Sequence, residues 1–249
     1  MSKGLVLVTG AGTRVGAGIA RRLAADGWTI GVHYNSSRAG ADETADAIRA
    51  SGGAAEVLQA DLSAEASIDA MCASLAERGD WVGLVNSAAS FDYDSIADFQ
   101  MTTATAQVRL NLIAPVYLAH KFAGGIAPNA RGFVTNIADQ KVLNPNPDFL
   151  SYTLAKTGLA HATAPLAMAL APRIRVNCIA AGLMLISGDQ SAENFKRVHD
   201  ANLTLMGTRV EDVADAVAYL ASAENITGAV LPVDGGQHLV PSARDVMFD

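Results

Sequence analysis

The sequence predicts an α/β protein in which one doubly wound parallel sheet is covered by helices on both faces. Two observations support this fold class. Short apolar, β-branched segments alternate with longer helical segments along all 249 residues, and a glycine-rich turn directly follows the first of them. Alternating strands and helices are joined by right-handed crossovers, which make the sheet parallel. Because 50% of the residues are hydrophobic, the chain can build one large core, and we expect a single domain over residues 1–249.

The segments expected to form strands are short and mostly apolar. They are residues 5–9, 29–34, 55–59, 82–86, 132–137, 174–178 and 230–233. Helices are expected between them, at residues 16–26, 40–51, 64–78, 103–123, 152–170 and 210–222. Ligands of such sheets bind outside the carboxyl ends of the strands. The residues that end the strands, near 9, 86, 137–139 and 180–182, are therefore expected to meet at the site.

Glycines fill the turn after the first strand. Gly10, Gly16 and Gly18 lie between this strand and the first helix, with the spacing GxxxxxGxG. Bare backbone can approach a pyrophosphate closely, and the helix N-terminus supplies N–H donors and a partial positive charge. The turn predicts nucleotide binding, although glycines also serve in ordinary tight turns.

The end of the second strand predicts which nicotinamide cofactor binds. A carboxylate there would bond the ribose 2′-hydroxyl of NAD. Here the strand runs from His33 into Ser36, Ser37 and Arg38, with no acidic residue. Hydroxyls and an arginine favour a 2′-phosphate, and Arg14 in the glycine turn is a second cation. We predict NADPH; the alternative is that both arginines are ordinary surface residues.

Tyr152 and Lys156 are candidates for proton transfer. The spacing YxxxK in a predicted helix places the phenol and the ammonium on one face. The ammonium is expected to lower the pKa of Tyr152 toward neutral pH, which would let the phenol exchange a proton with a substrate. Alone, this spacing is also typical of a surface tyrosine beside a solvated lysine.

Together these residues resemble the short-chain dehydrogenase/reductase family over nearly the whole chain. The motifs that carry the resemblance are TGAGTRVGAG with Thr9, Gly10, Gly16 and Gly18, then Asp61-Leu62, Asn86-Ser87-Ala88-Ala89, Asn111, the pair Tyr152 and Lys156, Asn177 to Gly182, and Val233-Asp234-Gly235-Gly236. The resemblance implies a single-domain Rossmann fold. It also implies a homodimer or homotetramer formed through the helices at 103–123 and 152–170.

Asp139 stands where most members of the family carry a serine. A buried carboxyl is costly to ionise, so its pKa is expected to rise. Protonated, it can donate to a ring nitrogen; ionised, it can accept from an N–H group; both suit a nitrogen heterocycle better than a ketone. Asp139, Arg14 and the segment from His33 to Ser37 resemble the pteridine reductases and the related dihydromonapterin/dihydrofolate reductases, in which a phenylalanine matching Phe91 stacks on the pterin.

The resemblance implies hydride transfer from NADPH to a C=N carbon of a dihydropterin-like ring, with the proton from Tyr152 or Asp139. The implied catalytic residues are Asn111 (through a water relay to Lys156), Asp139, Tyr152 and Lys156. The implied cofactor contacts are Gly10, Thr13, Arg14, Val15, Gly16, His33, Tyr34, Asn35, Ser36, Ser37, Asp61, Leu62, Asn86, Ala88, Tyr152, Lys156 and Gly182. The implied substrate contacts are Phe91, Asp139, Tyr152, Leu183 and Met184, with a lid over residues 183–208.

Other interpretations remain open. A carbonyl or 3-ketoacyl reductase would use the same fold and the same Tyr152–Lys156 pair, but Asp139 in place of serine counts against it. A non-catalytic NADPH-binding regulator is opposed by the intact set of Asn111, Tyr152 and Lys156. Phe91 can instead pack in its own loop. Lys141, close to Asp139, either pairs with that carboxylate or is solvated.

Charge and composition limit the partners. The net charge of −7 argues against nucleic acid or an anionic membrane as a main partner. Cys72 and Cys178 suggest a reducing compartment, and the first strand begins too early for a leader peptide, so we expect a cytoplasmic protein with a small-molecule substrate. The histidines are scattered without ligand spacing, so no metal site is predicted.

Overall fold

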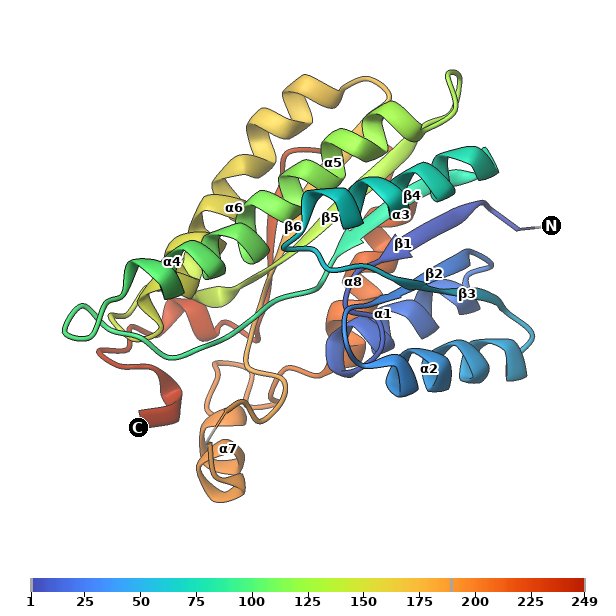
Figure 1. Cartoon of the computed structure of the whole chain (residues 1–249). Coiled ribbons are helices and arrows are strands. Elements are labelled where there is room, and N and C mark those ends of the chain that lie inside the picture. The colour runs from blue at the N-terminus through green and yellow to red at the C-terminus, as the bar shows by residue number, and fades with distance from the viewer. Residues whose placement is uncertain (1, 189, 249) are drawn as a thin grey trace.

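The computed structural model describes residues 2–188 and 190–248 as a seven-stranded parallel sheet between two layers of helices (Figure 1). The strands are β1 (Leu5–Val8), β2 (Thr29–Tyr34), β3 (Ala54–Gln59), β4 (Trp81–Asn86), β5 (Gly132–Asp139), β6 (Ile174–Ala181) and β7 (Val230–Val233). Their order is β3-β2-β1-β4-β5-β6-β7, so the direction of winding reverses between β1 and β4. The predicted fold class is confirmed, and this reversal is the point where ligands of doubly wound sheets bind.

Two layers of helices cover the sheet (Figure 1). One face carries α1 (Arg14–Ala25), α2 (Arg38–Ala50) and α8 (Val210–Ser222). The other face carries α3 (Glu65–Arg78), α4 (Met101–Val108), α5 (Ala114–Gly125) and α6 (Leu150–Leu170). Among the described residues, no helix is long and apolar enough to cross a membrane.

The first strand shows why both layers are needed. Side chains alternate across a strand, so β1 sends Val6 and Val8 into the core cluster of α1 and α8 and Leu5 and Leu7 into the cluster of α3 and α5. All four side chains are fully buried. Each contributes about 2 kcal/mol by leaving water. A run that is apolar at every position therefore specifies a strand buried on both faces.

Two strands are longer than their sequence patterns suggest. The apolar runs predicted strands over 132–137 and 174–178, but β5 and β6 pair in register until Asp139 lies opposite Ala181. Backbone pairing extends both strands through residues that carry no local strand signal. Asp139 is thereby held as the last residue of β5, at the carboxyl edge of the sheet.

The helix predicted over 103–123 is interrupted. A π-helical turn, Arg109–Ile113, separates α4 from α5. Pro115, at the start of α5, has no N–H to donate to the carbonyl of Asn111, the residue four positions before it. The missing bond explains a wider turn here and leaves the Asn111 carbonyl without its α-helical donor.

The segment predicted as a lid contains a helix that the sequence pattern did not reveal. Within 183–188 and 190–208, α7 (Ala192–His199) begins after Ser191, whose hydroxyl accepts the N–H of Asn194 at 3.1 Å. No residue of α7 is buried, and the helix stands away from both layers (Figure 1). Eight residues are too few for an apolar face to repeat, so the sequence pattern gives only a weak signal for this helix.

Candidate active site

A cavity of about 520 Å³ opens at the carboxyl ends of the strands, on both sides of the β1–β4 switch point. Most of the predicted site residues line it. They are Gly10, Thr13, Arg14, Val15, Gly16, His33, Tyr34, Asn35, Ser36, Ser37, Leu62, Ala88, Phe91, Asp139, Tyr152, Lys156, Gly182, Leu183 and Met184. Asp61, Asn86 and Asn111 were predicted with them but do not line the cavity.

The glycine turn brings backbone to the cavity wall. Gly10 has a φ of +66°, and a Cβ at Gly16 would overlap the Gly10 carbonyl, so geometry excludes a side chain at these two positions. Thr13 precedes α1 without making a side-chain cap, which leaves the first N–H groups of the helix open. Bare backbone and a helix N-terminus are what a phosphate requires, so these residues fit a dinucleotide.

His33 braces this turn. Gly10 donates its N–H to His33 Nδ1 at 3.1 Å, so the proton is on Nε2, which donates to the Ala60 carbonyl at 3.0 Å. Burial lowers the pKa of His33 to about 4, and the ring is neutral at physiological pH. Both ring nitrogens are used within the protein, so His33 shapes the cofactor cradle rather than offering it a charge.

The two arginines behave differently. Arg14 lines the cavity with a φ of +51°, and its guanidinium donates to the Ile186 carbonyl at 3.0 Å and to Ser187 Oγ at 3.3 Å. This left-handed backbone is one that glycine adopts more readily than arginine. Arg38 instead pairs with Asp42 at 2.8 Å, one helical turn away, and does not line the cavity, so its contact with a 2′-phosphate stays a prediction.

Three predicted residues are bound inside the protein. The Asp61 carboxylate accepts the hydroxyl and the N–H of Ser63 at 2.7 and 2.8 Å, which lowers its pKa. Asn86 donates to Asn136 at 2.8 Å. The fully buried Asn111 is held by Ser90 and Gln107. Each of the three side chains is thus engaged within the protein, although Asn86 Oδ1 has no hydrogen-bond partner among the described residues, and their roles toward a cofactor or a water relay stay predictions.

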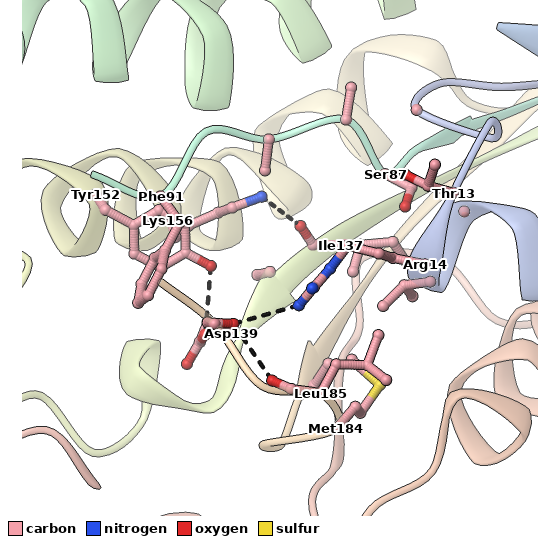
Figure 2. A pocket seen from close by; sticks show the side chains of 18 of the residues that line it. Thr13, Arg14, Ser87, Phe91, Ile137, Asp139, Tyr152, Lys156, Met184 and Leu185 are labelled. Carbon is pink, nitrogen blue, oxygen red and sulfur yellow. Dashed lines mark hydrogen bonds between the residues drawn. The ribbon is translucent and has the colours of Figure 1, made fainter. Parts of the chain in front are cut away.

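Tyr152 and Lys156 lie side by side on α6, facing the end of β5. The Tyr152 hydroxyl donates to Asp139 Oδ2 at 3.3 Å, and Lys156 Nζ donates to the Ile137 carbonyl at 2.8 Å (Figure 2). The other carboxylate oxygen of Asp139 accepts the backbone N–H of Lys141 at 2.9 Å. The structure therefore brings the predicted acid, phenol and ammonium to one place.

Burial dominates the electrostatics of this group. It raises the pKa of Asp139 and lowers the pKa of Lys156 to about 8. Burial, then the charge of Asp139, raises the pKa of Tyr152 well above its usual value. The predicted lowering of the Tyr152 pKa was wrong for this state. The ammonium lies 5.8 Å from the ring centroid and is directed to a carbonyl, whereas a carboxylate faces the hydroxyl.

Phe91 lines the cavity beside Tyr152. Its ring stacks on Phe149 with centroids 4.0 Å apart and meets the Tyr152 ring edge-on at 4.7 Å. One face of Phe91 is therefore already covered within the protein. Of the two predicted lid residues, Leu183 donates its N–H to Gln237 at 3.0 Å, and Met184 packs against the core cluster of α1 and α8.

Several lining residues were not predicted. They are Gln190, Gln237, Asp245, Val246 and Met247, with Lys141 beside Asp139. Lys141 was expected to pair with Asp139 or to be solvated; it is buried and pairs with Asp245 at 2.9 Å. The partner of this lysine is more than 100 residues away, and no local pattern indicates so distant a contact.

These features define a class of protein. A doubly wound sheet with a bare glycine turn at its switch point, opposite a buried Tyr–Lys–Asp group, is the arrangement of an oxidoreductase. The family model described as enoyl-(acyl carrier protein) reductase matches residues 10–238. The chain belongs to the short-chain dehydrogenase/reductase family and is an enzyme of that family.

Known proteins similar to the chain differ in substrate. The solved structure of FolM alternative dihydrofolate reductase 1 from Brucella canis, complexed with NADP, is 36% identical, with a TM-score of 0.91 over 98% of this chain and 97% of that chain. Pteridine reductase 1 of Leishmania tarentolae is 31% identical over 94% of this chain and 96% of its own. The 3beta-hydroxysteroid dehydrogenase 1 of Eggerthella lenta is 35% identical over 95% and 94%. The family is thus established, whereas the substrate needs a separate argument.

Proposed function

We propose that the protein is an NADPH-dependent reductase that acts on the C=N bond of a dihydropterin-like ring. One observation carries the proposal: inside the cavity, the Tyr152 hydroxyl faces the Asp139 carboxyl at 3.3 Å. Burial raises the pKa of Asp139, so this acid can hold a proton for a ring nitrogen or, once ionised, accept from an N–H group. A ketone oxygen is only an acceptor and gains nothing from the ionised form.

The cofactor proposal rests on the glycine turn and the end of β2. Gly10, Gly16 and the open N-terminus of α1 suit the pyrophosphate, and Arg14 lines the same part of the cavity. Ser36 and Ser37 line the cavity, and their hydroxyls would suit a 2′-phosphate. The NADP complex of the Brucella relative supports the same choice. When bound, NADPH supplies the hydride.

Side chains of the protein would donate the proton and stabilise the charge that its transfer leaves behind. Tyr152 is the donor to the substrate nitrogen or oxygen, and Asp139 orients the ring and shares that proton. Lys156 would bond the nicotinamide ribose and stabilise negative charge on Tyr152. We assign the water relay to the Asn111 carbonyl, because Pro115 leaves it without an α-helical donor and its side chain is engaged elsewhere.

A second candidate is reduction of a ring ketone. It is favoured by the similarity to the 3beta-hydroxysteroid dehydrogenase, whose name refers to a steroid hydroxyl rather than to a nitrogen heterocycle. The Tyr152–Lys156 pair would act in the same way on a carbonyl. Asp139 distinguishes the two candidates.

Purified protein should oxidise NADPH, and NADH far more slowly, when given dihydrobiopterin, dihydromonapterin or dihydrofolate. We expect kcat/KM for the dihydropterins to exceed that for a quinone, a steroid ketone or an acetoacetyl thioester by at least about 100-fold, because only the heterocycle pairs with Asp139. The measurement is the loss of reduced-nicotinamide absorbance with each substrate. Turnover of the ketones alone would contradict the pterin proposal and favour the second candidate.

The pH dependence of kcat/KM for NADPH should follow the protonation of Lys156. Its pKa is lowered by burial to about 8, so the ammonium is present below pH 8 and is lost as the pH rises through that value. Because the charged form is the active one, kcat/KM for NADPH should fall about tenfold per pH unit above about pH 8. The profile of kcat/KM against pH tests this, with Lys156→Arg as the comparison whose charge persists. A flat profile to about pH 10 would exclude Lys156 as the titrating group.

We further propose that the enzyme is a cytoplasmic homodimer or homotetramer. Met101 on α4 and Leu154 and Met168 on α6 are exposed at 73, 55 and 81%, which is unusual for large apolar side chains and suits an interface between copies. Cys72 and Cys178 are free, buried thiols, as expected in a reducing compartment.

A further inference from the structure

The C-terminal segment Arg244–Phe248 closes the substrate end of the cavity. Asp245, Val246 and Met247 line the cavity together with Asp139 and Tyr152. The segment ends in a short 3-10 helix, Val246–Phe248, beside the beginning of α6 (Figure 1, red). It reaches this place from the far end of the chain, after β7.

A buried lysine fastens the segment. Lys141 Nζ donates to Asn146 Oδ1, to the Asp148 carbonyl and to Asp245 Oδ2, each at 2.9 Å. The Lys141 side chain is only 3% exposed. An ammonium has three N–H groups, so all three are used to join the loop after β5 to the C-terminal segment. Lys141 has no proton left for a ligand and acts by positioning.

A second set of contacts holds the same segment. The Asp148 carboxylate accepts hydrogen bonds from Nε and Nη2 of Arg244, at 2.7 and 2.9 Å. It also accepts one from the backbone N–H of Asp245, at 2.8 Å. A two-point guanidinium–carboxylate contact fixes orientation as well as distance. We call this network, with the Lys141–Asp245 pair, the C-terminal clamp.

The clamp connects to the catalytic group in three ways. The Phe248 ring packs on Tyr93 and Phe149, at 5.4 and 6.3 Å between centroids, and Phe149 stacks on Phe91. The Lys141 backbone N–H donates to Asp139. After burial, the charge of Asp245 is a further cause that raises the pKa of Asp139. One network of contacts thus holds both Asp139 and the C-terminal residues that line the cavity.

We propose that the segment Arg244–Phe248, held by the C-terminal clamp, is the specificity-determining wall of the substrate end and that Lys141 is its positioning residue. The wall limits the site to a flat ring lying against Tyr152 and Asp139, because the clamp fixes a backbone segment where a bulkier substrate would extend. The inference deepens the proposed reduction and rests on it for the substrate class. The clamp itself is observed in the structure and does not depend on the substrate.

The test compares Lys141→Met with the wild type. Opening the wall should raise KM for dihydrobiopterin about tenfold and lower KM for a bulky polycyclic ketone, so that the KM ratio of the two changes by at least about tenfold, with kcat for the pterin changing less than about threefold. NADPH affinity should stay within about twofold, since the glycine turn is elsewhere in the cavity. Lys141→Arg keeps the positive charge and should keep the KM ratio close to that of the wild type.

A readout independent of activity accompanies the kinetics. Trypsin should cleave after Arg244 at least about tenfold faster in Lys141→Met than in the wild type. Mass spectrometry of the released C-terminal peptide measures the cleavage rate. Arg22→Met is the matched control, because it removes an exposed ion pair with Asp215 on the opposite face of the sheet. If Lys141→Met is insoluble, Lys141→Met/Asp245→Leu removes the pair without leaving a buried charge unpaired, and the same changes are expected.

The outcomes separate the two proposals. Unchanged trypsin cleavage in both variants would overturn the clamp. Faster cleavage with an unchanged KM ratio, or with equal losses for both substrates and for NADPH, would overturn the wall. If the wild type does not turn over the pterin, the proposed function fails. The wall is then tested by the ketone series alone, where KM should fall in the variants in proportion to substrate bulk.

Discussion

Tyr152→Phe is expected to lower kcat for the preferred substrate by about 10²–10⁴-fold, the contribution typical of a proton donor in the transition state. The substitution removes only the hydroxyl that donates to Asp139 and keeps the ring that meets Phe91 edge-on at 4.7 Å. NADPH affinity should therefore change by less than about twofold. Steady-state oxidation of NADPH and a fluorescence titration of the cofactor measure the two quantities.

Tyr219→Phe is the matched control for this prediction. Tyr219 lies on α8 and is 57% exposed, away from the cavity, so loss of its hydroxyl should leave kcat unchanged. If Tyr152→Phe retains more than about a tenth of the wild-type kcat, Tyr152 is not the proton donor. The Asp139 carboxyl would then take that role, since it is the acidic group nearest the lost hydroxyl.

Asp139→Ser is expected to separate the two candidate substrates. Serine restores the hydroxyl that suits a ketone oxygen, and it removes the carboxyl that pairs with a ring nitrogen or N–H group. We expect kcat/KM for a dihydropterin to fall about 10³-fold or more and that for a ring ketone to change by less than about tenfold, because a site built for polar pairing discriminates strongly. The ratio of the two kcat/KM values in wild type and variant is the measurement.

Asp139→Asn refines this test. The amide keeps the shape and can donate a hydrogen bond, but it carries no transferable proton and no charge. If it retains pterin binding and loses kcat, Asp139 takes part in proton transfer; if KM rises instead, Asp139 mainly orients the ring. Equal losses on pterin and ketone in Asp139→Ser would contradict the heterocycle argument.

The strands show how far local patterns reach. Leu5, Val6, Leu7 and Val8 are apolar at consecutive positions, and the strand, buried on both faces, places all four out of water. The glycines of the turn were predictable for a similar reason, because Gly10 adopts a positive φ and a side chain at Gly16 would overlap backbone. In both cases the residues themselves carry the constraint.

The candidate site was predictable in its members and less so in their interactions. Asp139 was expected at the carboxyl edge of the sheet, and the family resemblance put Tyr152 and Lys156 of the following helix beside it; the structure brings the three together. The partner that each charged side chain contacts depends on which groups of the fold compete for it. Arg38 turns to Asp42, and Lys156 turns to the Ile137 carbonyl, so the expected lowering of the Tyr152 pKa does not occur.

The sequence by itself determined the order of strands and helices along the chain and the bare turn at the end of β1, because both follow from residue type and short-range spacing. It also determined the acid, phenol and ammonium at the site, because their motifs resemble those of the family. Only the tertiary structure decided that Lys141 is buried against Asp245 and that the last residues wall the cavity. The physical reason is chain distance: contacts between remote segments are selected by the packing and burial of the whole fold, and no local preference encodes them.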